Sequence, residues 1–323
     1  MFLQVIFELS LILDSDKFGN LFDRTYSDFE YVDEDIFADY ALTSKGLTIL
    51  YCDSQYKKKI KIFVNPCQLL DSNEPEPEKL TRKLEKRVNS YFNNKFQLDD
   101  FELSGMTLTT DIDVHSSERV YDYLKVLSRI GMVKGFSPSR DNWLDDDTGL
   151  CYDGNSNGIK FMLYDLEALY GEQASNFSLG QKSLPEDCEG LLRAEVKLIK
   201  PKAIRGYTNE SSISKQMAEL YDRKQKIFLE TFLRIVPFGN FYKKYKAEEI
   251  IREKVKDAAI RRRMLRLVEL VPEKKSLLLA QKALNYRRID KVMIAFFDIE
   301  VAPVTISKRH DIKKLDNICN YLR

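Results

Sequence analysis

The chain is poor in the residues that build histidine or cysteine metal centres. Its 323 residues include only two histidines, His115 and His310, and five cysteines with no close pair. Two separated histidines exclude a motif with adjacent histidine ligands. An odd number of scattered cysteines argues against a disulfide framework or a zinc knuckle and for a reducing compartment. Oxygen ligands are left as the dominant donors, and these favour Mg²⁺ or Mn²⁺ over zinc.

Long apolar runs are also missing. The apolar start, Met1–Leu13, has no basic lead-in and is interrupted by Gln4, Glu8 and Ser10, so it is interpreted as a strand and not as a signal peptide. No segment approaches the length of a membrane span. With 44% hydrophobic and 31% charged residues, the chain is long enough for two domains with their own cores.

Charge is unevenly distributed, although the net charge is only +1. Residues 241–323 carry 21 Lys and Arg against 11 Asp and Glu, whereas residues 1–240 carry 30 against 39. A basic end on an acidic body is expected of a protein that holds nucleic acid with its tail. Helix surfaces rich in lysine and arginine give the same asymmetry, so the count leaves both interpretations open.

Three short segments combine apolar residues with a tyrosine or with charged side chains. A strand turns successive side chains to opposite faces, so Asp111, Asp113 and His115 share one face of the segment 107–115. The same period groups Arg193, Glu195 and Lys197 on the segment 192–198.

The third segment, 160–165, carries Tyr164. If the three strands are neighbours, one sheet face presents a tyrosine, carboxylates and cations, which is the equipment of a metal-assisted phosphodiester-cleaving tyrosine enzyme. Each residue also has an ordinary structural interpretation. The tyrosine can be a packing residue, Glu195 part of a solvated strand face with weak ion pairs, and His115 a polar strand end.

The pattern predicts an α+β fold with two α+β units that form one mostly antiparallel sheet with helices on one face. The first unit, residues 1–100, has a strand at 1–13, an acidic edge or loop at 23–39, a hairpin at 46–64 and a helix marked by Leu80, Leu84, Val88 and Phe92. The second, 101–236, has a strand at 106–114, a helix from Ser116 or Ser117 to Gly131, a hairpin at 149–165 and the Glu195 strand.

Residues 237–323 form a basic, mainly helical C-terminal domain in this prediction. Helices are expected at 246–270, 275–286 and 311–322, with an apolar segment at 292–304. The arginines of the first helix could contact DNA phosphates without reading sequence; they are Arg261, Arg262, Arg263 and Arg266. A helix-turn-helix and an oligomerisation surface remain alternatives for this region.

Several short segments, none specific alone, follow one another in a fixed order. They are Gly46-Leu47-Thr48-Ile49-Leu50-Tyr51, Lys59-Ile60-Lys61-Ile62-Phe63-Val64-Asn65-Pro66, Ile112-Asp113, Tyr123-Leu124-Lys125, Asn142-Trp143, Tyr164 with Glu167, and Leu192-Arg193-Ala194-Glu195. This order resembles the gene II replication proteins of filamentous phages, a family related to the rolling-circle initiators of small plasmids. The resemblance extends over residues 1–205.

In that family a strand tyrosine attacks a DNA phosphodiester, stays joined to the 5′ phosphate and frees a 3′ hydroxyl that primes replication. The resemblance places the nucleophile at Tyr164 and metal ligands at Asp113 and Glu195. A phenol with a pKa of about 10 needs a nearby cation or metal to attack at neutral pH. A divalent ion would polarise the phosphoryl oxygens, and the planar fork of Arg193 could clamp one of them.

The resemblance therefore implies a site-specific DNA nickase and strand transferase that uses Mg²⁺ or Mn²⁺. Its implied partners are single-stranded or supercoiled origin DNA, a host helicase and a host polymerase. It would work in the cytoplasm of a bacterial host, without a membrane, and a homodimer is one candidate assembly.

Two positions depart from the family pattern. Leu166 stands where a lysine is usual, and Asp111 stands where an arginine is expected. Lys160 or Lys197 could supply the missing cation, and Asp111 could instead join His115 as an added metal ligand. The same departures support a second hypothesis, a DNA-binding initiator or regulator that kept the scaffold and lost the chemistry.

Overall fold

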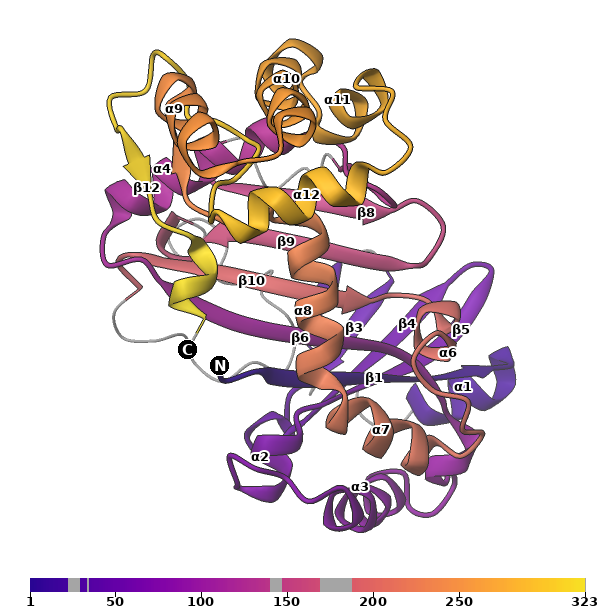
Figure 1. The fold of residues 1–323 in the computed structure, drawn as a ribbon. Helices are drawn as coiled ribbons and strands as arrows, with labels where there is room; N and C mark the ends of the chain where they lie inside the picture. The colour runs from indigo at the N-terminus through magenta and orange to yellow at the C-terminus, as the bar shows by residue number, and fades with distance from the viewer. Residues whose placement is uncertain (23–29, 34, 140–146, 169–187, 323) are drawn as a thin grey trace.

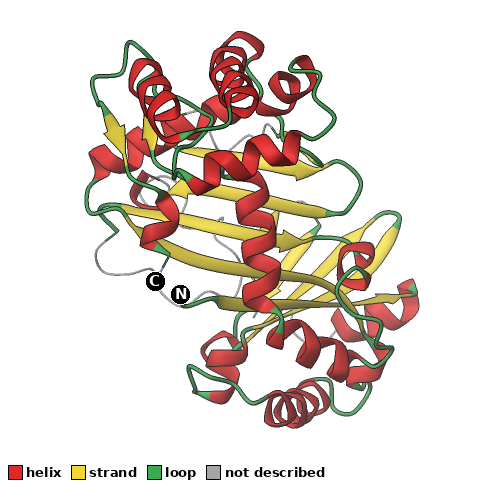
Figure 2. Cartoon of the chain, in the orientation of Figure 1, coloured by secondary structure: helices red, strands yellow, loops and turns green. Residues whose placement is uncertain are grey.

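A ten-stranded sheet forms the centre of the molecule (Figures 1 and 2). The computed structural model describes residues 1–22, 30–33, 35–139, 147–168 and 188–322. The strand order is β2-β3-β4-β5-β1-β6-β10-β9-β8-β7, and every neighbouring pair is antiparallel. The predicted α+β class and the continuous antiparallel sheet are confirmed.

The first half of the chain builds one side of this sheet. Its elements are β1 (Gln4–Leu13), α1 (Ser15–Phe22), β2 (Glu30–Asp33), β3 (Ile36–Asp39), the 3₁₀ turn η2 (Thr43–Lys45), β4 (Leu47–Ser54), β5 (Lys57–Val64), α2 (Pro66–Leu70) and α3 (Pro77–Tyr91). The acidic stretch supplies the edge strands β2 and β3, as expected of an edge. On α3, the predicted apolar positions Leu80, Leu84 and Val88 are buried.

The second half builds the other side. Its elements are η3 (Leu98–Asp100), β6 (Glu102–Asp113), α4 (Ser117–Leu127), η4 (Ser128–Ile130), β7 (Phe136–Pro138), β8 (Gly149–Gly154), β9 (Ile159–Asp165), β10 (Leu191–Leu198), α6 (Pro201–Arg205), α7 (Ile213–Asp222) and α8 (Lys224–Ile235). The two halves join where β1 pairs with β6. Ser116 caps α4 as predicted, because its side chain accepts a hydrogen bond from the backbone N–H of Arg119.

One face of the sheet carries the main core. On β10 the alternate residues Leu192, Ala194 and Val196 are completely buried in it, as the period of two predicts. In Figure 1, α8 crosses this face over β9, β10 and β6. Phe232 of α8 meets Phe161 of β9 edge to face, with ring centroids 5.8 Å apart. The helices thus cover one face, and the charged strand residues lie on the other.

The C-terminal region is helical but differs in detail from its prediction. It contains β11 (Phe241–Tyr242), α9 (Lys244–Lys254), α10 (Ala258–Lys274), α11 (Leu277–Ala283), α12 (Ile289–Asp298), β12 (Lys314–Leu315) and η5 (Ile318–Tyr321). The single helix expected at 246–270 is two helices, because Asp257 caps a new one by accepting from the N–H groups of Ala259 and Ile260.

The helix predicted at 311–322 is wrong. Lys314 and Leu315 pair instead with β11, and the backbone N–H of Asn317 donates to the side chain of Asn240. Tertiary pairing therefore overrides the local helical pattern. The region also docks on α4, since the hydroxyl of Tyr123 donates to the carbonyl of Asp316.

None of the helices in the described ranges is long and apolar enough to cross a membrane.

The packing of α8 on the sheet can be tested by truncating Phe232, which is completely buried. Phe232→Ala should lower the free energy of unfolding in urea by about 3–5 kcal/mol, because it leaves a cavity in the core. The neighbouring Leu233 is 46% exposed, so Leu233→Ala should cost less than about 0.5 kcal/mol. Equal losses from the two variants would contradict this packing.

Candidate functional site

The strand register brings the predicted site residues into rows on the face opposite the helices. Arg193 on β10 pairs with Tyr164 of β9 on one side and with Asp111 of β6 on the other. Glu195 lies two residues further along β10, on the same face. The three strands are therefore neighbours, with β10 in the middle, which meets the condition that the sequence left open.

Tyr164 is buried on this face. Its hydroxyl donates a hydrogen bond to Oε1 of Glu195 at 2.9 Å, and the residue is only 2% exposed. It belongs to a small apolar cluster, separate from the main core, which we call the tyrosine cluster; its members are Cys151, Met162, Tyr164, Leu166 and Cys188. Burial, followed by the nearby charge of Glu195, raises the pKa of the phenol far above its ordinary value. The phenol is therefore protonated at neutral pH.

Glu195 is a buried carboxylate with both oxygens engaged. It is 1% exposed, with Oε1 facing Tyr164 and Oε2 lying 2.8 Å from Nζ of Lys197. Oε2 has no hydrogen-bond partner among the described residues, so this second contact is an ion pair. Burial is the largest influence and raises the pKa of the carboxyl group, but the contact with Lys197, the hydrogen bond from Tyr164 and the charge of Arg193 together outweigh it, so the net pKa is lowered. Glu195 is therefore ionised at neutral pH.

Arg193 and Asp111 form a two-pronged pair beside this network. Nε of Arg193 donates to Oδ1 of Asp111 at 2.7 Å, and the terminal Nη2 donates to Oδ2 at 2.9 Å. The side chain of Arg193 is 6% exposed and that of Asp111 is 31% exposed. The guanidinium group of Arg193, which the sequence assigns to a DNA phosphate, is thus hydrogen-bonded to Asp111. Asp111 is the residue that departs from the family pattern.

Asp113 and His115 lie at the open end of β6 and point to solvent. Oδ1 of Asp113 accepts a hydrogen bond from the backbone N–H of His115 at 2.8 Å, and their side chains are 63% and 65% exposed. His115 also has a positive φ of 77°, as befits a residue that leaves the strand. The two side chains form a local turn contact, and the ring of His115 also meets the ring of Tyr321 edge to face.

The four predicted metal ligands are therefore not gathered into one site. Asp111 is neutralised by Arg193, Glu195 by Lys197, and Asp113 contacts His115 at the strand end. Across the described ranges no group of three or more His, Cys, Asp or Glu side chains is arranged to hold a metal ion. As arranged here, these four residues do not form a binding site for a divalent cation. The use of Mg²⁺ or Mn²⁺ by the protein stays an untested prediction.

The predicted DNA-binding cations lie in two places. Lys160 is half-buried on β9, opposite Lys197 in the register. Three of the arginines on α10 are engaged locally: Arg261 donates to the carbonyl of Val255, Arg263 stacks on the ring of Tyr286, and Arg266 pairs with Glu269. Arg262 is exposed. Trp143, part of the family resemblance, lies outside the described residues.

Burial of the Tyr164 phenol under the tyrosine cluster was not predicted from the sequence, although the apolar pattern around it indicated this. Met162 and Tyr164 alternate along β9, with Leu166 just past the end of the strand, and Phe161 and Leu163 lie on its other face. A strand that is apolar on both faces is covered on both faces. Leu166, which stands in place of the family lysine, is completely buried in this cover.

Comparison with known proteins adds little. No protein-family model matches the chain, and neither does any curated protein. Among solved structures, a rolling circle replication initiator protein from Geobacillus stearothermophilus aligns with 95% of this chain and 100% of its own chain, at a TM-score of 0.31 and 11% sequence identity. A similarity of this size carries no functional argument, so any function has to rest on the residues of this chain.

The pair of Arg193 and Asp111 should contribute to stability through its buried guanidinium group. Arg193→Met should lower the free energy of unfolding by about 1.5–3 kcal/mol, because it removes two charge-assisted hydrogen bonds made by a side chain that is only 6% exposed. Lys61 pairs with Glu8 on the same face through one contact, and its side chain is 29% exposed, so Lys61→Met should cost less than about 1 kcal/mol. Urea denaturation measures both, and a larger loss for Lys61→Met contradicts the assignment.

The raised pKa of Tyr164 predicts a specific loss of stability at alkaline pH. The folded protein keeps the phenolic proton while the unfolded chain releases it near pH 10, so stability falls as pH rises above that value. Between about pH 8 and about pH 11 the free energy of unfolding of Tyr164→Phe should fall by about 1.4 kcal/mol less than that of the wild type. Tyr56 is 91% exposed, and Tyr56→Phe should behave like the wild type. Identical pH profiles for all three proteins would exclude a buried, protonated phenol at residue 164.

Proposed function

We propose that this chain is a rolling-circle replication initiator that binds origin DNA and cleaves it with Tyr164. The observation that carries the proposal is the hydrogen bond of 2.9 Å from the phenol to Glu195, on the sheet face that also holds Arg193 and Lys197. These residues supply a nucleophile, a base and two cations for a phosphodiester. The ordered resemblance of the sequence motifs supplies the reaction type.

The chemistry follows from the roles of these groups. Glu195 is ionised and accepts the phenolic proton as Oη of Tyr164 forms a bond to phosphorus. The bond from phosphorus to the 3′ oxygen breaks, and that oxygen leaves with a proton from solvent as a 3′ hydroxyl. The 5′ phosphate stays on the tyrosine. Arg193 and Lys197 offset the negative charge that develops on the phosphoryl oxygens.

The arrangement described is a closed form. Tyr164 is 2% exposed, so DNA reaches the phenol only after the tyrosine cluster opens. Arg193 must also exchange Asp111 for a phosphate group, whose two free oxygens can accept the same two hydrogen bonds as the carboxylate. DNA binding therefore supplies the free energy of opening. This requirement couples cleavage to binding and protects the phenol when DNA is absent.

No step of this proposal runs through a metal ion, because the described acids are paired with cations and do not fit one. The dependence of DNA cleavage on Mg²⁺ or Mn²⁺ is left to experiment. Binding of the DNA backbone is assigned to the basic C-terminal region, where Arg262 is exposed. A host helicase and polymerase, a bacterial cytoplasm and a homodimer belong to the same proposal.

A second candidate is a DNA-binding initiator or regulator that does not cut. The observation in its favour is that the charged groups around the phenol are already paired: Tyr164 donates to Glu195, Glu195 pairs with Lys197, and Arg193 pairs with Asp111. A network of paired charges can be purely structural.

Covalent capture of DNA distinguishes the two functions. The wild type is incubated with 3′-labelled random-sequence single-stranded DNA and, separately, with supercoiled plasmid, each with Mg²⁺, Mn²⁺ or EDTA. Labelled protein on a denaturing gel is the expected result, because the 5′ phosphate stays on the enzyme. Tyr164→Phe should abolish the adduct and keep DNA binding, and Glu195→Gln should slow its formation by about 10²–10⁴-fold.

Tyr152 provides the matched control. It lies on the neighbouring strand β8 and is also 2% exposed, but it faces the main core. Tyr152→Phe should form the adduct at the wild-type rate. A wild type that binds DNA and never forms an adduct under any of these conditions establishes the second candidate.

A further inference from the structure

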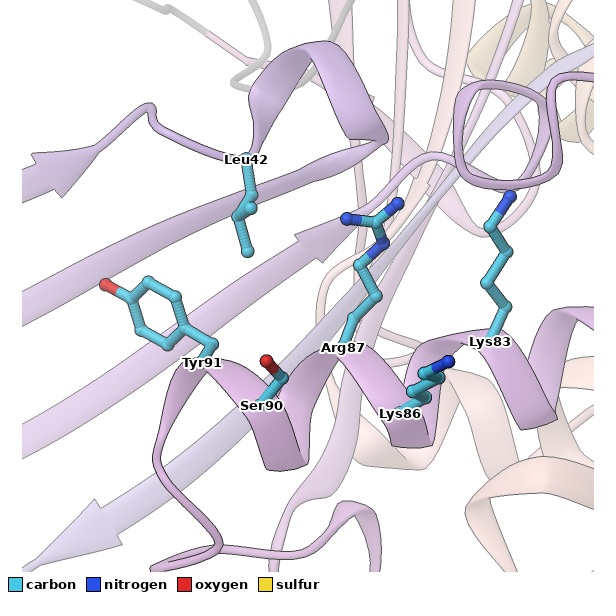
Figure 3. Close-up of a pocket in the computed structure, with 6 residues that line it drawn as sticks. All are labelled: Leu42, Lys83, Lys86, Arg87, Ser90 and Tyr91. Carbon is cyan, nitrogen blue, oxygen red and sulfur yellow. The ribbon is translucent and has the colours of Figure 1, made fainter.

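Three cations on α3 line a pocket on the helical side of the molecule. Lys83, Lys86 and Arg87 surround a cavity of about 450 Å³, which is completed by Leu42, Ser90 and Tyr91. Figure 3 shows Lys83 and Arg87 projecting from α3 to the same side, with Leu42 facing them from the turn between β3 and β4. Among the described residues that line the cavity there is no carboxylate.

These cations lack the ion pairs found elsewhere on the same helix. Lys79 on α3 pairs with Glu76 at 2.7 Å, whereas within the described ranges no ion pair involves Lys83, Lys86 or Arg87. Lys83 and Arg87 are four residues apart, so they share one side of the helix, and two like charges at that spacing repel each other. Both are only half-exposed, which leaves their charge less screened than on an open surface.

Two acids of the described residues, Glu85 and Asp39, do not line the pocket. Glu85, between the cations in sequence, lies on the opposite side of α3 because successive helical residues are about 100° apart. Asp39 accepts a hydrogen bond from the hydroxyl of Tyr91 and another from the backbone N–H of Ala41. The pocket therefore has a net positive charge, a forked donor in Arg87 and a hydroxyl donor in Ser90.

We propose that this pocket binds a phosphate group, carried by a DNA backbone or by a nucleotide. Arg87 offers its planar fork to two phosphate oxygens, Lys83 and Lys86 contribute point charges, and Ser90 donates a hydrogen bond. The ring of Tyr91 forms one wall, against which a sugar or base can pack.

The pocket is distinct from the tyrosine site. It adjoins the turn that follows β3, whereas Tyr164 lies on β9, and the strands β4, β5, β1, β6 and β10 separate them in the sheet. It also lies on α3, which packs on the face opposite Tyr164. Phosphate binding at α3 consequently does not depend on whether the chain cleaves DNA.

The double variant Lys83→Gln/Arg87→Gln tests the proposal in the full-length protein. Its probes are a fluorescent oligothymidine, followed by anisotropy, and ATP and inorganic phosphate, followed by calorimetry. Loss of two phosphate contacts should weaken oligothymidine binding about tenfold at low salt and reduce the slope of log affinity against log salt by about 1.4. Lys79→Gln is the matched control on the same helix and should stay within about twofold of the wild type.

The probes separate the two sources of phosphate. Weaker binding of oligothymidine alone identifies the DNA backbone as the ligand, and weaker binding of ATP identifies a nucleotide; either result supports the pocket. Equal binding of oligothymidine, ATP and inorganic phosphate by the double variant and the wild type overturns it, as does a wild type that binds none of the three. Tyr164→Phe should bind all three probes normally, so failure of cleavage and failure of this pocket give different results. Circular dichroism and urea unfolding establish that each variant is folded.

Discussion

The buried carboxylate of Glu195 is the constraint around which this sheet face is arranged. Removing a carboxylate from water costs several kcal/mol unless partners replace the lost hydration. Here the partners come from both β9 and β10: the phenol of Tyr164 donates to one oxygen, and the ammonium group of Lys197 neutralises the charge at the other. Because a slip of one residue would turn these side chains to the opposite face, the network also fixes the strand register.

If Tyr164 is the nucleophile that we propose, the same network keeps it unreactive in the absence of DNA. A phenol whose pKa is raised by burial and by a neighbouring carboxylate is a poor nucleophile, and the tyrosine cluster keeps phosphodiesters away from it. Contact with DNA would bring phosphates, whose charge competes with Asp111 for Arg193. Under the proposed function, these groups are assembled in advance and access to them is the controlled step.

The positive regions of the molecule are separated in space. The cations near Tyr164 are paired with acids, those on α10 are partly occupied by local contacts, and those on α3 line an open pocket. The net charge of the chain, which is only +1, does not reveal these separate positive regions. Which cations have acidic partners, and which do not, decides where an anionic ligand can bind.

Much of the fold could be predicted from local patterns. The strand around Glu195, the hairpin ending in Tyr164 and the cap at Ser116 follow from alternation and from capping chemistry, so the sequence placed them correctly. The pairing of Arg193 with Asp111 could not be predicted, because it depends on β10 lying between β6 and β9. The helix predicted at 311–322 was wrong for the same reason, since the strand β11 with which this segment pairs lies far away in sequence.

The central claim is that the phenol of residue 164 forms the covalent bond to DNA, and mass spectrometry tests it most directly. Protein incubated with single-stranded DNA is digested with nuclease and protease, and its peptides are sequenced. The account predicts a nucleotide joined through its 5′ phosphate to the peptide that contains Tyr164, with Glu195→Gln reducing its yield. A nucleotide on any other tyrosine, or unmodified Tyr164 in protein that has cut its DNA, would contradict it.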